Sequence, residues 1–209
     1  MKKKHFIFDV DDTLIDSYAL NQQLFVETFS NYLDLSNHEI EKYLCELHLK
    51  SRGTSMLLQF QEAVTHFSLS IDPQKLVRQN EKLQIKNSKQ VTLFDSVKEL
   101  FIKLTSQGRK VSVCTNRPKQ SLLKILKGQG VQNYLTNIVS CHDAKHEKPD
   151  PFCLIKLIKE SGEPKTDFIY FGDSITDYQF AENAGIDFII IDYYLNQKKF
   201  YKLIVQSFV

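Results

Sequence analysis

The sequence predicts an α/β fold, a parallel β-sheet flanked by helices, with a helical segment inserted after the first strand. Residues 5–10 form a short apolar run that ends at carboxylates, which is typical of a buried strand. Residues 16–91 are polar and show helical periodicity. After about residue 92, short apolar strands alternate with helices. This order predicts an α/β core made of residues 1–15 and 92–209, interrupted by residues 16–91, which we call the helical insert.

The elements follow in chain order. Within the helical insert, apolar residues recur at helical spacing, and strand-like runs are absent; these residues are Leu20, Leu24, Phe25, Phe29, Ile40, Leu44 and Leu47. Four further strands are expected at 111–115, 137–141, 168–172 and 188–191, separated by helices with apolar faces around 122–126 and 154–158. A closing helix would bury Phe200, Leu203, Ile204 and Phe208. Such alternation indicates a parallel sheet covered on both faces.

Composition excludes several classes of protein. The 209 residues carry a net charge of +2, too little for a dedicated nucleic-acid-binding protein, while 15 Phe and 9 Tyr argue against disorder. The apolar runs are shorter than the ~18 residues that span a bilayer and fall short of a secretory signal. The four cysteines have neither CxxC nor zinc spacing. We therefore expect a cytoplasmic protein, monomer or homodimer, that binds neither nucleic acid nor membrane.

Polar residues follow the predicted strands, where open α/β sheets bind their ligands. Asp9 and Asp11 lie two apart after the first strand, so both can face one site. Asp173 and Asp177 follow the fourth core strand. Convergent carboxylates without clustered His or Cys favour a hard cation such as Mg²⁺. Thr115, at the end of another strand, supplies a hydroxyl suited to phosphate oxygens.

Lys148 adds a cation suited to the same phosphate oxygens. Each of these features is weak by itself. Their occurrence at successive strand ends of one sheet is the stronger signal.

Four segments carry a resemblance to a known family. FIFDVDDTL, VCTNRP, the KPDP that follows Glu147, and FGDSITD resemble, in order and spacing, the motifs of the haloacid dehalogenase-like superfamily. The chain is most similar to its capped phosphatases of the phosphoglycolate phosphatase type. The resemblance implies a Rossmann-like parallel sheet of order 5-4-1-2-3, with the helical insert as a mobile cap.

The resemblance also implies roles for individual residues. Asp9 would be the nucleophile that forms an aspartyl-phosphate, and Asp11 the general acid and then base. Thr115, Asn116 and Lys148 would bind the phosphoryl group. Mg²⁺ would be held by Asp9, the backbone carbonyl of Asp11 and Asp173, with Asp177 steadying these ligands. Because dehalogenating relatives lack a carboxylate at the position of Asp11, its presence indicates phosphoryl transfer.

One departure from the family pattern and one segment of the insert bear on the site. Asp12 stands where glycine is commoner in the family, and it tolerates unusual backbone angles better than most residues. In the helical insert, the turn-like segment 49–55 carries Lys50 and Arg52. We hypothesise that one of them reaches an anionic or hydroxylated leaving group when the cap closes.

The leading interpretation is a Mg²⁺-dependent phosphatase acting on a small phosphorylated metabolite. A second is a mutase resembling β-phosphoglucomutase, which would share the aspartyl-phosphate but keep water from it. A third is a non-catalytic phospho-acceptor module resembling receiver domains. In those domains, however, the accepting Asp lies mid-chain and no helical insert is present, and Asp11 would have no role.

Overall fold

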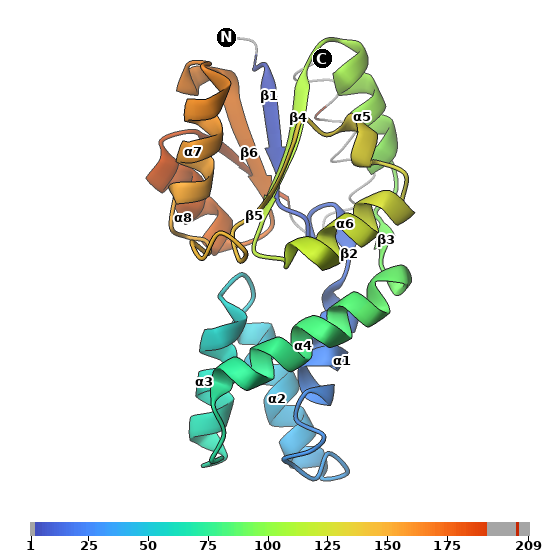
Figure 1. The fold of residues 1–209 in the computed structure, drawn as a ribbon, viewed down its shortest axis with the longest axis vertical. Coiled ribbons are helices and arrows are strands. Elements are labelled where there is room, and N and C mark those ends of the chain that lie inside the picture. The colour runs from blue at the N-terminus through green and yellow to red at the C-terminus, as the bar shows by residue number, and fades with distance from the viewer. Residues whose placement is uncertain (1–2, 192–203, 205–209) are drawn as a thin grey trace.

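The computed structural model describes residues 3–191 and residue 204, and a five-stranded parallel sheet forms the centre of its α/β core (Figure 1). The strands are β1 (His5–Phe8), β4 (Lys110–Thr115), β5 (Asn137–Ser140), β6 (Phe168–Gly172) and β7 (Asp187–Ile190), arranged β5-β4-β1-β6-β7. All four pairings are parallel. Numbered by chain order within this sheet and followed from β7, the strands run 5-4-1-2-3, so the expected Rossmann-like sheet is found.

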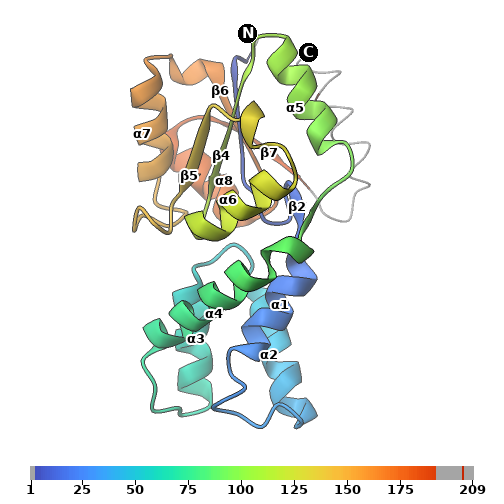
Figure 2. The ribbon, with the colours of Figure 1, turned by 45° about the vertical axis from the view of Figure 1, so that its right-hand side comes forward.

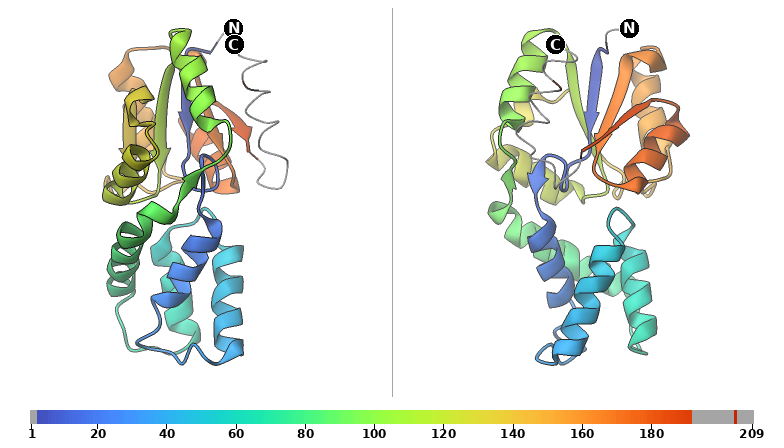
Figure 3. Two further views of the ribbon diagram at one scale, coloured as in Figure 1. Left: turned by 90° about the vertical axis from the view of Figure 1, so that its right-hand side faces the viewer. Right: turned by 180° about the vertical axis from the view of Figure 1, so that it is seen from behind.

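Helices cover both faces of the sheet (Figures 1 and 3). Helices α5 (Val97–Ser106) and α6 (Lys119–Gly128) pack on one face, and α7 (Phe152–Ser161) and α8 (Ile175–Ala184) pack on the other. Alternation along β1 sets the two cores, because Phe6 and Phe8 join the first while Ile7 joins the second. Two 3₁₀ turns, η2 (Gln132–Tyr134) and η3 (Lys165–Asp167), complete the connections.

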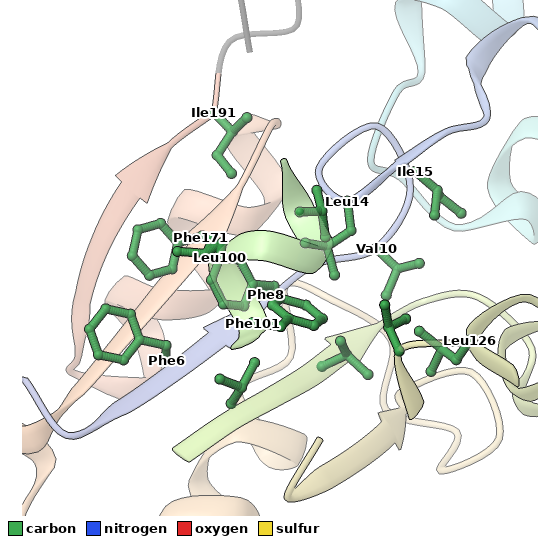
Figure 4. Packing of buried hydrophobic residues seen from close by; sticks show 14 of the residues in the cluster. Phe6, Phe8, Val10, Leu14, Ile15, Leu100, Phe101, Leu126, Phe171 and Ile191 are labelled. Atoms are coloured by element: carbon green, nitrogen blue, oxygen red, sulfur yellow. The ribbon is translucent and has the colours of Figure 1, made fainter. Parts of the chain in front are cut away.

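Aromatic packing fixes the end of β1, from which the first acidic loop departs (Figure 4). The Phe8 ring stacks on Phe171 of β6 at 4.7 Å between centroids and tilts against Phe101 of α5 at 5.7 Å. All three side chains are fully buried. Burial contributes on the order of 2 kcal/mol for each ring, so the loop after β1 starts from a rigid point.

The first strand ends earlier than expected. The apolar run 5–10 predicted a strand through Val10, but β1 ends at Phe8. The carbonyl of Val10 accepts hydrogen bonds from the backbone N–H groups of Leu14 at 2.9 Å and Ile15 at 3.1 Å. Val10 therefore closes a tight turn and leaves the sheet, although its side chain is fully buried.

The helical insert contains α1 (Tyr18–Glu27), α2 (His38–Lys50), α3 (Met56–His66), α4 (Pro73–Asn87) and the 3₁₀ turn η1 (Ser88–Gln90). It lies below the carboxyl end of the sheet (Figures 1 and 2). Its helices bury a hydrophobic cluster of their own, composed of Phe25, Phe29, Leu44, Leu47, Phe60, Ala63, Leu76 and Val77. The insert thus has a core separate from those of the sheet.

A short antiparallel ribbon joins the insert to the core. Strands β2 (Ile15–Asp16) and β3 (Thr92–Leu93) pair Ile15 with Leu93 and Asp16 with Thr92. Sequence analysis did not predict either strand, because two residues are too short to show a periodicity.

Ile204 is buried with the first core cluster, whereas Phe200, Leu203 and Phe208 of the expected closing helix lie outside the described residues. Among the helices described, none combines the length and apolar character required to cross a membrane.

Candidate active site

The carboxyl end of the sheet, where the acidic and polar strand-end residues lie, faces the helical insert, as the ribbon in Figure 3 shows. Asp9 leaves β1, and its backbone N–H donates to the carbonyl of Phe171 on β6 at 2.8 Å. One pocket is lined by most of the expected site residues, which are Asp9, Asp11, Thr115, Asn116, Lys148 and Asp173. Asp177 is buried beside them on α8. The topology therefore brings all four motifs together.

Lys148 links two of the carboxylates. Its Nζ lies 2.7 Å from Oδ1 of Asp9 and 2.7 Å from Oδ1 of Asp177, and all three side chains are buried. Burial by itself would lower the pKa of Lys148, but the two carboxylates outweigh it and raise that pKa above its ordinary value. Lys148 therefore carries a fixed positive charge at the base of the pocket.

One lysine does not neutralise the acidic cluster. Burial, followed by repulsion from Asp177 and Asp11, raises the pKa of Asp9 to about 7, although Lys148 opposes the shift. Burial and the charges of Asp9 and Asp177 raise the pKa of Asp173 to about 8. Carboxylate oxygens of Asp9, Asp173 and Asp177 all lie within 4.8 Å of one another. Oxygen donors with uncompensated charge fit a hard divalent cation such as Mg²⁺.

Asp177 is held in place by its own helix terminus. The Ser174 backbone N–H donates to Asp177 Oδ2 at 3.2 Å and the Asp177 backbone N–H donates to Ser174 Oγ at 3.2 Å, which forms a capping box at the start of α8. The Oγ of Ser174 also donates to Oδ2 at 2.5 Å. A Cβ at Gly172 would lie 2.4 Å from that of Asp177, so only glycine fits there. The Asp177 carboxylate is therefore fixed in place, and its supporting role in metal binding stays a prediction.

Asp11 lies in a different environment from the acidic cluster. Nε of Arg117 donates to its Oδ2 at 2.9 Å, and Arg117 Nη2 forms an ion pair with its Oδ1. Ser17 Oγ and Asn21 Nδ2 also donate to Oδ1, at 2.7 and 3.0 Å. Burial would raise the pKa of Asp11, but Arg117 and these hydrogen bonds outweigh it and lower that pKa to about 2. Asp11 is therefore ionised in this arrangement.

Arg117 was given no role by sequence analysis. It is 4% exposed, and its Nη1 also donates to Ser121 at 2.8 Å. The one local feature of the sequence that points to a functional role for Arg117 is its position two residues after Thr115 at a strand end. That position did not distinguish an ion pair with Asp11, 106 residues away, from a surface charge.

Two of the residues expected to bind phosphate, Thr115 and Asn116, are held by hydrogen bonds, and one donor of Asn116 has no partner among the described residues. Thr115 is buried at the end of β4, and its Oγ1 accepts from the backbone N–H of Arg117 at 3.2 Å. Asn116 Oδ1 accepts from the backbone N–H of Lys148 at 2.8 Å, which ties two motifs together. Asn116 Nδ2 is buried without a partner. That amide is a donor available to an oxyanion in the pocket.

The helical insert contributes Arg52 to the pocket. Its Nη2 lies 2.7 Å from Oδ2 of Asp173 and 3.4 Å from Oδ2 of Asp12. The neighbouring Gly53 has a φ of +79°, and a Cβ there would lie 2.6 Å from Oγ of Ser174, so this loop docks tightly on the start of α8. Lys50 is exposed and is not among the pocket-lining residues. Of the two cations expected near the substrate, the structure brings only Arg52 to the pocket.

Asp12 adopts an unusual backbone angle of the kind that aspartate tolerates, with a φ of +56°. Its Oδ1 accepts from the backbone N–H of Ser17 at 3.3 Å and from the Ser17 Oγ at 3.2 Å. Burial and the neighbouring Asp11 raise the pKa of Asp12 to about 6. Asp12 thus braces the turn before α1 and adds negative charge near Arg52.

Comparison with known proteins agrees with these observations. A parallel sheet with a buried acidic cluster at its carboxyl end defines an α/β enzyme with a site suited to a divalent cation. The family model for haloacid dehalogenase-like hydrolases matches residues 6–191. The chain therefore belongs to the haloacid dehalogenase-like hydrolase family, which confirms the family and the hydrolase class expected from the motifs.

Two curated proteins similar to this chain are named for different activities. A phosphoglycolate phosphatase of Pectobacterium atrosepticum is 34% identical over 94 residues, which are 45% of this chain and 40% of that protein. The match thus spans less than half of that relative. The pyrophosphatase PpaX of Halalkalibacterium halodurans is 26% identical over 191 residues, covering 90% of this chain and 82% of that protein.

Two solved structures share the fold. A haloacid dehalogenase-like hydrolase from Bacteroides fragilis aligns with a TM-score of 0.78 at 18% identity, over 97% of this chain and 93% of that chain. A predicted phosphoglycolate phosphatase from Haemophilus somnus aligns with a TM-score of 0.78 at 21% identity, over 92% and 87%.

Proposed function

We propose that this protein is a Mg²⁺-dependent phosphatase that hydrolyses a small phosphomonoester through an aspartyl-phosphate on Asp9. The observation that carries the proposal is the buried contact of 2.7 Å between Asp9 Oδ1 and Lys148 Nζ, at the base of a pocket that Thr115 and Asn116 also line. Membership of the hydrolase family supports it.

We propose that the helical insert, residues 16–91, acts as a cap over a catalytic core of residues 1–15 and 92–209. Its separate hydrophobic cluster and the contact of Arg52 with Asp173 support this division. The cap would exclude water from the pocket during the first step and open to release products.

In the first step, the Asp9 carboxylate attacks phosphorus, a new O–P bond forms, and the bond from phosphorus to the alcohol oxygen breaks. Asp11 gives its proton to the departing alcohol. In the second step, water attacks the phosphorus of the aspartyl-phosphate while Asp11 takes a proton from it, and Asp9 is regenerated as phosphate leaves. Lys148, Thr115 and Asn116 stabilise the equatorial phosphoryl oxygens.

Asp9 and Asp173 would hold Mg²⁺, together with the backbone carbonyl of Asp11, and Asp177 would steady these ligands. When bound, the cation neutralises charge repulsion between the carboxylates and an incoming phosphate dianion. The mutual proximity of the three carboxylates supports this arrangement.

The ionised state of Asp11 bears on the order of events. Asp11 begins as a carboxylate paired with Arg117, so it needs a proton before it can act as an acid. A phosphate dianion bound next to Asp11 disfavours its charged form and raises its pKa. We propose that substrate binding loosens the pair with Arg117 and supplies the protonated acid.

Lys50 and Arg52 were the candidates for substrate specificity. We propose this role for Arg52, since Arg52 lines the pocket. We also propose that the enzyme acts in the cytoplasm, in keeping with its free cysteines at positions 45, 114, 141 and 153.

The test is a phosphate-release screen over small phosphomonoesters, with Mg²⁺ and with chelator, comparing the natural chain with Asp9→Asn. We expect release that requires Mg²⁺ and is lost in Asp9→Asn, whose circular dichroism and Tm show a folded chain. Release that persists in Asp9→Asn would contradict the nucleophile. An isomerised sugar phosphate in place of free phosphate would identify a mutase.

A further inference from the structure

On the proposed mechanism, the leaving group of the substrate would lie against the wall that the helical insert contributes to the pocket. This wall contains Tyr18, Asn21, His48, Arg52, Gln59, Asn80, Glu81 and Gln84. The phosphoryl group would lie beside Asp9 and Lys148. The chemistry of the wall therefore bears on which alcohol carries the phosphate.

Each Lys or Arg side chain in the pocket is paired with a carboxylate. The described residues contribute three Lys and Arg side chains to its lining, and each contacts a carboxylate: Lys148 with Asp9 and Asp177, Arg117 with Asp11, and Arg52 with Asp173 and Asp12. A second anionic group on the substrate would have to compete with these carboxylates for one of the three cations.

Two further carboxylates line the same pocket. Glu81 of α4 and Glu147 of the core each contact one nitrogen of His142 at 2.7 Å. His48, the other histidine in the lining, shares a hydrogen bond of 2.9 Å with Gln59, and burial lowers its pKa. A carboxylate or second phosphate on the leaving group would therefore meet negative charge on this side.

A chain of hydrogen bonds in the insert leaves one acceptor free. Thr28 Oγ1 donates to the Leu24 carbonyl at 2.7 Å, so it accepts from Asn80 Nδ2 at 3.1 Å. Asn80 Oδ1 then accepts from Gln84 Nε2 at 2.9 Å. This sequence of donors orients the Gln84 amide, and its Oε1 is buried with no hydrogen-bond partner.

A buried acceptor without a partner is costly, by about 1–3 kcal/mol, unless a ligand satisfies it. Gln84 is one of the residues that line the pocket. Of the groups on a substrate, a hydroxyl can donate to such an amide oxygen. A carboxylate or phosphate dianion has no proton to give. The unpaired Oε1 of Gln84 therefore favours a leaving group with a hydroxyl over one with an anionic group.

We infer that the leaving group is an uncharged alcohol bearing a further hydroxyl, as in a polyol or sugar phosphate, and that Gln84 accepts a hydrogen bond from it. This inference rests on the proposed phosphatase activity and specifies its substrate class. The expected substrate differs from phosphoglycolate and pyrophosphate, which the names of the two curated relatives denote. Both of those compounds have anionic leaving groups.

A matched pair of substrates provides the first test. 2-Hydroxyethyl phosphate and phosphoglycolate differ only in a CH₂OH group against a carboxylate. We expect kcat/KM with Mg²⁺ to be at least about tenfold higher for 2-hydroxyethyl phosphate, and pyrophosphate to be poorer still. An equal or higher value for phosphoglycolate or pyrophosphate would overturn the inference while leaving the phosphatase intact. Release from none of these, nor from p-nitrophenyl phosphate, would refute the proposed function itself.

A pair of variants provides the second test. Gln84→Leu removes the acceptor, and Gln74→Leu makes the same change at an exposed position of the same helix. The measured quantity is kcat/KM for 2-hydroxyethyl phosphate divided by kcat/KM for p-nitrophenyl phosphate, whose leaving group carries no further hydroxyl. We expect this ratio to fall about three- to tenfold in Gln84→Leu and to be unchanged in Gln74→Leu. An equal loss on both substrates would show that Gln84 has only a structural role.

Discussion

Glu81 and His142 form an ion pair between the helical insert and the α/β core. Oε1 of Glu81, on α4, lies 2.7 Å from Nε2 of His142, in the loop that follows β5. The other ring nitrogen, Nδ1, lies 2.7 Å from Glu147, immediately before Lys148. A protonated His142 thus connects the insert to the segment that carries Lys148.

The contact predicts that cap closure depends on pH. The hydrogen bond to Glu147 contributes most to raising the pKa of His142, with help from the charge of Glu81. A raised pKa means that this stabilisation is fully present below the ordinary value of 6.5 and is lost as pH rises through the folded value. We expect hydrogen exchange in the segment 49–55 to accelerate between pH 6 and 8 beyond the intrinsic pH dependence of amide exchange.

Two variants isolate this effect. His142→Gln should remove the extra pH dependence of exchange in the segment 49–55. His146→Gln should leave it, because His146 pairs with Asp150 at 2.7 Å within the core loop and does not reach the insert. If segment 49–55 of His142→Gln exchanged like that of the natural chain at both pH 6 and pH 8, the pair of Glu81 with His142 would not control closure of the helical insert.

Metal binding should stabilise the fold more at high pH. The pKa values of Asp9 and Asp173 are raised to about 7 and about 8, so the folded chain without metal holds protons that the unfolded chain releases near pH 4. Its stability therefore falls as pH rises from about 4 to 8. Because Mg²⁺ requires the deprotonated carboxylates, we expect it to raise Tm by several degrees at pH 8 and by less at pH 6. Calorimetric scans with Mg²⁺ and with chelator measure this difference, and Asp173→Asn should abolish it.

Arg117→Gln should affect both stability and turnover. The change leaves Asp11 with Ser17 and Asn21 as donors, and we expect a loss of about 1–3 kcal/mol in the free energy of unfolding at neutral pH. We also expect kcat to fall by more than about tenfold, because Asp11 is no longer oriented. Urea unfolding and steady-state kinetics check both effects, with exposed Lys119→Gln as the control. An unchanged kcat would show that Arg117 does not position Asp11.

Gly53→Ala should prevent the loop of the insert from docking on α8. A Cβ there would meet Ser174 Oγ at 2.6 Å, and φ is +79°. Gly108→Ala imposes a similar backbone strain, with φ at +72° and open space around the Cβ. We expect kcat/KM to fall at least about fivefold in Gly53→Ala and to change less than twofold in Gly108→Ala, although both lose about 1 kcal/mol of stability. Similar kinetic effects in the two variants would indicate strain alone.

Local patterns were sufficient to predict the sheet and the positions of its acidic loops. Apolar runs ending at Asp9, Thr115 and Asp173 mark strands, and parallel strands place their carboxyl ends at one edge. The motif resemblance added the strand order. Both kinds of evidence depend on short segments of sequence.

Contacts between distant segments could not be predicted in this way. The ion pair of Arg117 with Asp11 joins residues 106 apart, and an arginine after a strand has no local feature that specifies its partner. The direction of the Gln84 amide depends on Asn80 and, through it, on Thr28, 52 residues from Asn80. The partner of an arginine and the direction of an amide depend on tertiary packing.

The ribbon of β2 and β3 has a consequence for how this enzyme can diversify. Asp16 and Thr92, which bound the inserted segment, are direct neighbours across two antiparallel strands. A two-residue hairpin turn could join them without moving either strand. The length and sequence between these points are therefore decoupled from the geometry of the sheet. On the proposed function, substrate selection and phosphoryl chemistry can therefore change independently in evolution, and inserts could be exchanged between relatives at this junction.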